Sequence, residues 1–204
     1  MQDYKSPLEM FYHWEKETPN KLYMRQPING EWHKWTWSET ATEVRKMAAY
    51  LKSLDFPANS KIATLSKNCA HWIISDLAIM MAGHVSVPLY PNLKADSIKQ
   101  ILEHSEAKLL FVGKLDEFEN MRPGVPKDLA CIAFPFYSED GYPVWNDLVK
   151  DVPPMTENVV RDPMDLATII YTSGTTGMPK GVMHKFYNFS FATSNAVPLL
   201  GLAT

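Results

Sequence analysis

The chain has 204 residues, a net charge of −3, 46% hydrophobic residues and 21% charged residues. This length and composition suffice for one globular α/β unit, or for one large domain with a smaller appendage. The near-neutral charge, without a basic stripe, argues against a nucleic-acid-binding surface.

The sequence shows no signal for export or for crossing a membrane. Residues 1–5 are polar and lack the apolar centre of a signal peptide. The most apolar region, 72–90, contains Asp76 and His84, so it is not a clean membrane span. Cys69 and Cys131 match no metal or redox spacing. We therefore expect them to be reduced, mostly buried thiols of a cytosolic protein.

The N-terminal quarter predicts a helix, a hairpin and a second helix. Ser6-Pro7-Leu8-Glu9 has the pattern of a capping box with proline in the first turn. Asn29-Gly30 is a hairpin signal, and we interpret the tryptophans around it as structural. The expected elements are a helix to about Glu17 burying Leu8, Phe11, Tyr12 and Trp14, strands over 21–26 and 31–37, and a helix from Ser38 to about Leu54.

From Lys61 to Phe134, short apolar runs alternate with amphipathic segments. This β-α-β-α-β rhythm predicts a largely parallel sheet covered by helices, with the N-terminal hairpin at one edge. Asn68 and Asp96 are the expected N-caps of two of the helices. The expected strands are 62–65, 85–89, 109–112 and 130–134, and the expected helices are 70–81, 96–104 and 116–121.

The C-terminal third is predicted to deliver a special loop. Residues 134–163 are rich in proline and aromatic residues and are expected to cover the surface, with one short helix over 145–149. A strand over 166–171 then leads into the loop, followed by a brief strand over 182–184 and a helix from Tyr187.

Residues 171–181 read Y-T-S-G-T-T-G-M-P-K-G and have the composition of an anion-binding loop. Glycines let backbone N–H groups approach a ligand and form a concave nest for phosphate oxygens. The predicted ligands are the hydroxyls of Thr172, Ser173, Thr175 and Thr176, the backbone at Gly174 and Gly177, and the charge of Lys180. The order of residues differs from a Walker A loop, in which lysine directly follows glycine and precedes a hydroxyl residue. The stretch predicts a nucleotide polyphosphate loop; the alternative is a Gly/Thr-rich surface loop with a solvated lysine.

The loop resembles the signature [YFW]-T-S-G-[ST]-T-G-x-P-K-G of the adenylate-forming, or acyl-activating, superfamily. Residues 36–40 and 78–91 are similar to two further motifs of that superfamily, although Thr40 stands where leucine is usual. Residues 165–174 and Lys67-Asn68-Cys69 with Trp72 are similar to its long-chain fatty acyl-CoA synthetase branch. The resemblance thus covers most of the chain.

The resemblance implies a ligase that uses ATP, Mg²⁺ and coenzyme A. A fatty acid carboxylate would attack the α-phosphorus of ATP, releasing pyrophosphate, and the thiol of coenzyme A would then displace AMP from the acyl adenylate. It implies that the loop holds the β- and γ-phosphates, with Lys180 as a mobile counter-charge and Thr172 as a Mg²⁺ ligand. It also implies that His184 lies on the acyl side, where a satisfied structural histidine is the alternative.

The resemblance also implies that residues 1–204 are a truncated N-terminal, AMP-binding domain that is inactive alone. The later motifs and the C-terminal domain with the catalytic lysine are absent from this sequence. Alternatives are an aryl-CoA ligase, a luciferase-like enzyme, a peptide-synthetase adenylation domain, or a stand-alone nucleotide-binding module. We expect a cytoplasmic location, with peripheral membrane contact left open, and self-association through an exposed apolar edge.

Overall fold

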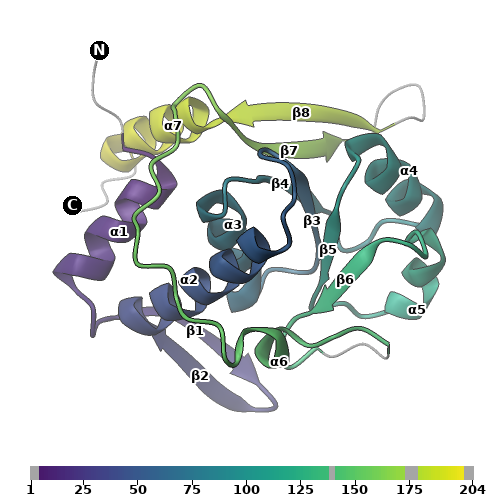
Figure 1. The fold of residues 1–204 in the computed structure, drawn as a ribbon, viewed down its shortest axis with the longest axis horizontal. Helices are drawn as coiled ribbons and strands as arrows, with labels where there is room; N and C mark the ends of the chain where they lie inside the picture. Colours follow the sequence, from purple (N-terminus) through teal and green to yellow (C-terminus); the bar gives the residue numbers. More distant parts are fainter. Residues whose placement is uncertain (1–4, 138–140, 173–178, 200–204) are drawn as a thin grey trace.

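A six-stranded sheet forms the centre of the molecule in the computed structural model, which describes residues 5–137, 141–172 and 179–199 (Figure 1). The strand order is β6-β5-β3-β4-β7-β8, and every neighbouring pair is parallel except β7 and β8. The predicted α/β class with a largely parallel sheet is therefore confirmed. The strands are β3 (Lys61–Leu65), β4 (Val85–Leu89), β5 (Leu109–Val112), β6 (Ala130–Ala133), β7 (Leu166–Thr172) and β8 (Lys180–Lys185).

Helices cover both faces of the sheet, and each face has its own apolar core. One face, here called the α3 face, packs against α1, α2, α3, α6 and the start of α7. The other, the α4 face, packs against α4 and α5. The helices are α1 (Pro7–Glu17), α2 (Trp37–Ser53), α3 (Ala70–Met81), α4 (Ala95–Ser105), α5 (Phe118–Met121), the 3₁₀ turn η1 (Arg122–Gly124), α6 (Trp145–Val149) and α7 (Phe186–Leu199).

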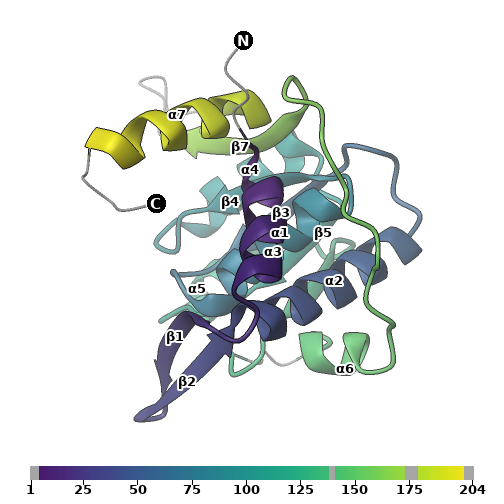
Figure 2. The ribbon, with the colours of Figure 1, turned by 90° about the vertical axis from the view of Figure 1, so that its left-hand side faces the viewer.

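The N-terminal hairpin forms a separate two-stranded sheet of β1 (Leu22–Ile28) and β2 (Glu31–Thr36). Its turn places Asn29 and Gly30 at positive φ (51° and 85°), the conformation that an Asn-Gly hairpin turn requires. The expectation of a hairpin at a sheet edge is wrong. The hairpin contacts α2 and α3 and projects from the body of the molecule (Figure 2), because Ile28 and Trp35 pack on Ala70 of α3.

Three further expectations about the N-terminal quarter need correction. Trp14 is only half-buried, although α1 otherwise buries the predicted residues. The second helix begins at Trp37 rather than Ser38, one residue earlier than expected, because Thr36 and Glu39 form its capping box. The interpretation of the tryptophans as structural holds for Trp35, which is buried, but not for Trp32, which is 57% exposed.

Two predicted helix caps are also wrong. Asn68 does not cap α3: the N-cap is Cys69, and the backbone N–H of Ala70 donates instead to Gln26 Oε1 of β1 at 2.6 Å. Gln26, which is distant in the sequence, therefore takes the place of the expected cap Asn68. Asp96 lies inside the first turn of α4, whose N-cap is Lys94, so its charge still faces the positive end of the helix.

The other elements follow the prediction closely. Helices α3 and α6 and strands β4 and β5 have the expected bounds. The short helix expected over 116–121 is confined to Phe118–Met121, and the brief strand over 182–184 extends to Lys180–Lys185 as the antiparallel edge strand β8. None of the described helices is long and apolar enough to span a bilayer.

Candidate functional site

Strands β7 and β8 form an antiparallel hairpin, and the predicted phosphate loop is the connection between them (Figure 1). Thr172, the last residue of β7, pairs directly with Lys180, the first residue of β8. Residues 173–178 lie outside the part of the chain that the structure describes. Five of the predicted ligands fall there: Ser173, Gly174, Thr175, Thr176 and Gly177. The described structure thus shows the two residues that flank the loop, Thr172 and Lys180, which are called the mouth of the loop below.

Thr172 and Lys180 lie on the same side of the hairpin, since residues paired across an antiparallel ladder share a face. Both side chains are exposed. Among the described residues, no carboxylate lies within ion-pair distance of Lys180. Thr172 and Lys180 therefore lie side by side where the loop begins and ends, and within the described part of the chain the lysine has no ion-pair partner. This pair can donate hydrogen bonds and a positive charge to an anion.

Gly181 lets β8 lie close against β7 just behind this pair. A Cβ atom at this position would lie 2.8 Å from Cγ2 of Ile169 and 3.2 Å from the ring of Tyr171. Real side chains do not approach that closely, so any other residue would push the strands apart. The role of Gly181 is close packing, because its φ is not positive.

Tyr171 anchors the same end of β7 to α4. Its side chain is 4% exposed, and its hydroxyl lies 2.7 Å from Nδ1 of His104 in the last turn of α4, with the two rings edge-to-face. Burial raises the pKa of the Tyr171 hydroxyl, so it stays a neutral hydrogen-bonding group. Sequence reasoning missed His104, since no local pattern relates it to a strand 67 residues later.

His184 lies on the same side of the hairpin but away from the mouth. It pairs with Thr168, and its ring lies 6.2 Å from that of Phe189 in α7. Four residues of extended strand separate it from Lys180, a distance of about 14 Å. The structure therefore does not bring His184 together with Thr172 and Lys180.

A row of polar side chains, buried at Thr168 and Ser86 and half-buried at Asp76, supports the middle of β7 on the α3 face. Thr168 Oγ1 donates to the backbone oxygen of Ser86 at 2.9 Å, and Asp76 of α3 bonds to the side chain of Ser86. Burial raises the pKa of Asp76 to about 6, and the bond from Ser86 opposes that rise. In the sequence Asp76 only interrupts an apolar run, and no local pattern reveals its partner, which lies on the following strand.

The beginning of β7 is held by Arg161, a second feature that sequence reasoning missed. This guanidinium is buried and donates to the backbone oxygens of Met80 and His84, to Asn59 Oδ1 and to Asp165 Oδ2, at 2.8 to 3.4 Å. Burial lowers the pKa of His84, and the nearby charge of Arg161 lowers it further. The strand that carries the loop is thus fixed at its start, middle and end.

With this geometry in view, comparison with known proteins identifies the family. Residues 11–201 match the family described as AMP-binding enzyme.

The chain belongs to the AMP-binding enzyme family.

Relatives of this AMP-binding chain activate different acids, according to their names. It is 30% identical to a long-chain-fatty-acid–CoA ligase of Mycobacterium bovis, over 84% of this chain and 30% of that protein. It is 36% identical to the 2-succinylbenzoate–CoA ligase of Bacillus licheniformis, over 91% of this chain and 35% of that protein. The chain spans about a third of the length of these curated relatives.

Solved structures confirm the fold of this AMP-binding chain. An anthranilate CoA ligase, crystallised with anthranoyl-AMP, superposes with a TM-score of 0.80 at 22% identity. The match covers 95% of this chain and 37% of the ligase. The largely parallel sheet with flanking helices is therefore the fold of known adenylate-forming ligases.

The described residues do not by themselves form a magnesium site. No group of three or more His, Cys, Asp or Glu side chains gathers among them to hold a metal ion. Thr172 offers one hydroxyl, whereas Mg²⁺ is usually held by carboxylates, water and substrate phosphates. The sequence-based role of Thr172 toward Mg²⁺ therefore stays a prediction.

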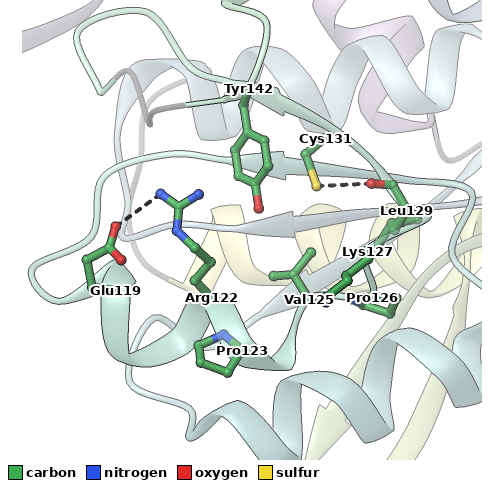
Figure 3. Close-up of a pocket in the computed structure, with 9 residues that line it drawn as sticks. All are labelled: Glu119, Arg122, Pro123, Val125, Pro126, Lys127, Leu129, Cys131 and Tyr142. Carbon is green, nitrogen blue, oxygen red and sulfur yellow. Dashed lines mark hydrogen bonds and ion pairs between the residues drawn. The ribbon is translucent and has the colours of Figure 1, made fainter.

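A separate pocket of about 450 Å³ lies beside η1 and the edge strand β6 (Figure 3). Cys131 lines it, and its thiol donates to the backbone oxygen of Leu129 at 3.4 Å. Burial raises the pKa of this thiol to about 11, so it stays protonated at neutral pH and is a poor nucleophile. Because β6 and β8 are opposite edges of the sheet, this pocket is remote from the loop. Cys69 and Cys131 are both buried and free, as predicted.

Proposed function

We propose that this chain carries the ATP-phosphate loop of an AMP-forming acid–thiol ligase whose substrate is a long-chain fatty acid. The observation that carries the proposal is the direct pairing of Thr172 with Lys180 at the two ends of the loop. Membership of the AMP-binding family supports adenylate formation. The named long-chain ligases among the relatives support the choice of acid.

The proposed reaction has two steps, and this chain serves the first. A carboxylate oxygen of the acid bonds to the α-phosphorus of ATP, and the bond to the β-phosphate oxygen breaks, releasing pyrophosphate. The thiol of coenzyme A then bonds to the acyl carbon, and AMP leaves. Negative charge grows on the departing pyrophosphate, so a fixed cation beside it lowers the barrier.

In this proposal Lys180 supplies that charge. The pairing with Thr172 holds its backbone at the start of β8, and its side chain is exposed. Bound Mg²⁺ would add further positive charge on the phosphates when ATP is present. Tyr171 and Gly181 then serve as positioning residues, because they fix the two strands directly behind the mouth.

The loop assignment is tested by ATP binding to the 204-residue chain, measured by isothermal titration calorimetry. We expect Lys180→Ala to weaken binding about tenfold, since a charge-assisted hydrogen bond is worth roughly 1.5 to 3 kcal/mol. Lys185→Ala is the matched control: this lysine is exposed on the same strand, and its backbone N–H bond to Asn188 would remain. Equal affinity of the Lys180→Ala and unmodified chains would refute the phosphate role.

A second candidate substrate is an aromatic acid, because the 2-succinylbenzoate–CoA ligase has the higher identity of the two reported relatives. Acyl-CoA formation by the enzyme that contains this chain separates the two. Palmitate, 2-succinylbenzoate and benzoate would be supplied separately with ATP and coenzyme A, and the thioesters measured by mass spectrometry. A clear preference for palmitate supports the proposal; a preference for either aromatic acid would replace its substrate.

A further inference from the structure

A second cavity lies on the same edge of the sheet as the loop, at the carboxyl ends of β3 and β5. Its volume is about 660 Å³, within the usual range for small-molecule sites. Asn68 and Cys69 of the segment after β3 line one wall, and Lys114 of the segment after β5 lines another. Residues 23–27 of β1 complete the lining from the hairpin.

The topology of the sheet opens a crevice at this place. After β3 the chain turns to the α3 face, whereas after β5 it turns to the α4 face. The two strands are neighbours in the sheet, so the segments that leave them diverge. Ligands of open α/β sheets bind at such switch points, outside the carboxyl ends of the strands.

The charges around the cavity favour an anion. Lys114 and Arg25 line it, and no aspartate or glutamate does, although the chain as a whole has a net charge of −3. The neighbouring Lys67, by contrast, is already paired with Asp116. The guanidinium of Arg25 also lies 4.9 Å from the centre of the exposed Trp32 ring.

The rest of the lining is apolar and well supported. Trp72 and Ile73 of α3 line the cavity; Trp72 is half-buried and Ile73 is 37% exposed. The walls are tied together: Gln26 accepts from the N–H of Ala70 at 2.6 Å and donates to the hydroxyl of Tyr137, also at 2.6 Å. A fixed cavity with cations at one side and apolar side chains at another suits an amphipathic anion.

We propose that this cavity binds a small amphipathic carboxylate, with its charge toward Lys114 and Arg25 and its apolar body against Trp72 and Ile73. The site is distinct from the phosphate loop, because β4 lies between β3 and β7. Two strand spacings separate the carboxyl ends of β3 and β7, about 10 Å. The inference does not rest on the proposed ligase function.

The test is a titration of the ¹⁵N-labelled 204-residue chain with decanoate in the absence of ATP, monitored by ¹H–¹⁵N NMR spectra. We expect saturable shifts at residues 68–73 and 114. Lys114→Gln should weaken the binding about tenfold, since it removes one charge-assisted contact. Ile73→Ser should also weaken it, through loss of apolar contact. Lys67→Gln is the matched control, because that lysine already has a partner, and Lys180→Ala shows independence from the loop.

The results of this titration either support the proposed carboxylate site or overturn it. The proposal is supported if the chemical-shift changes are confined to residues 68–73 and 114. Lys114→Gln and Ile73→Ser must reduce these changes, and the two control variants must not. Equal shifts with inorganic phosphate would overturn it, because a simple anion would then suffice. Absent or unsaturable shifts, or shifts centred on residues 168–184, would overturn it as well.

Discussion

At the scale of single residues, Gly181 and Asp76 determine how β7 meets its neighbours. Gly181 allows β8 to approach, because a side chain there would collide with Ile169 and Tyr171. The carboxyl group of Asp76 contacts Ser86 of β4, and Ser86 in turn accepts a hydrogen bond from Thr168 of β7. Both residues act behind the loop, so their effects should appear first in stability.

Gly181→Ala should destabilise the chain by about 1 to 3 kcal/mol, the usual cost of forcing an extra carbon into a packed site. The measurement is the free energy of unfolding in urea. Val182→Ala is the control, since Val182 is the next residue and is 44% exposed. If Gly181→Ala unfolds like the unmodified chain, the close contact with Ile169 is not a constraint.

Asp76 predicts a pH dependence of stability. Its folded-state pKa of about 6 lies above the ordinary value of 3.8, because burial disfavours the charged form. The stabilising contribution of this carboxyl is therefore fully present below about pH 4 and is lost as the pH rises through 6. Asp76→Asn, which stays neutral, should gain on the order of 1 to 2 kcal/mol relative to the unmodified chain between pH 4.5 and 7.5.

The measurement for Asp76 is urea unfolding across that pH range, with Asp128→Asn as the control at an exposed position. Subtracting the two chains removes the titration of all other groups. A difference that does not change with pH would show that Asp76 is not a buried acid.

At the scale of elements, Arg161 joins four segments around the start of β7. Its guanidinium binds the end of α3 at Met80, the turn before β4 at His84, and Asn59 before β3. It also lies 5.2 Å from the ring centre of Phe186, the first residue of α7. The hairpin that carries the loop thus depends on this residue for its placement on the sheet.

Arg161→Met should cost about 3 kcal/mol, because it removes every hydrogen bond that the buried guanidinium donates to Met80, His84 and Asn59. Arg161→Lys, which keeps the charge but offers fewer donors, should cost less. Hydrogen exchange is the more specific measurement: amides of β7 should lose protection before those of β5. Equal loss in both strands would mean that Arg161 has no local role in holding β7.

At the scale of the whole molecule, the loop and the second cavity share one edge of the sheet. Parallel strands bring their carboxyl ends to the same edge, so residues from β3, β5 and β7 meet there despite their separation in the sequence. The expected self-association stays a prediction. The exposed Met183 on edge strand β8 and Phe191 on α7 are where it would be sought.

The 204-residue chain alone should show no acid-dependent ATP–pyrophosphate exchange. The chain spans about a third of its curated relatives, and its described residues include no metal-binding cluster beside Thr172. The measurement is exchange of labelled pyrophosphate into ATP with palmitate present, using a full-length long-chain-fatty-acid–CoA ligase as the positive control. Exchange above the palmitate-free background would contradict the expectation.

The sequence by itself determined the elements and the family. Strands such as Val85–Leu89 and Leu109–Val112 were predictable because buried parallel strands are short apolar runs between turns. The loop was predictable because its glycines, hydroxyls and lysine are consecutive in the chain. The resemblance that these residues carry agrees with the family match.

Only the tertiary structure decided how those elements are held and what they place together. Arg161 bonds to Met80, 81 positions away, and Tyr171 bonds to His104, 67 positions away. At the start of α3, Gln26 accepts from Ala70, 44 positions away, in place of the local cap expected from Asn68. Such contacts leave no local pattern, because each depends on which strand lies beside which. Periodicity reports the burial of a residue within its own element, whereas partners are chosen by the packing of one element on another.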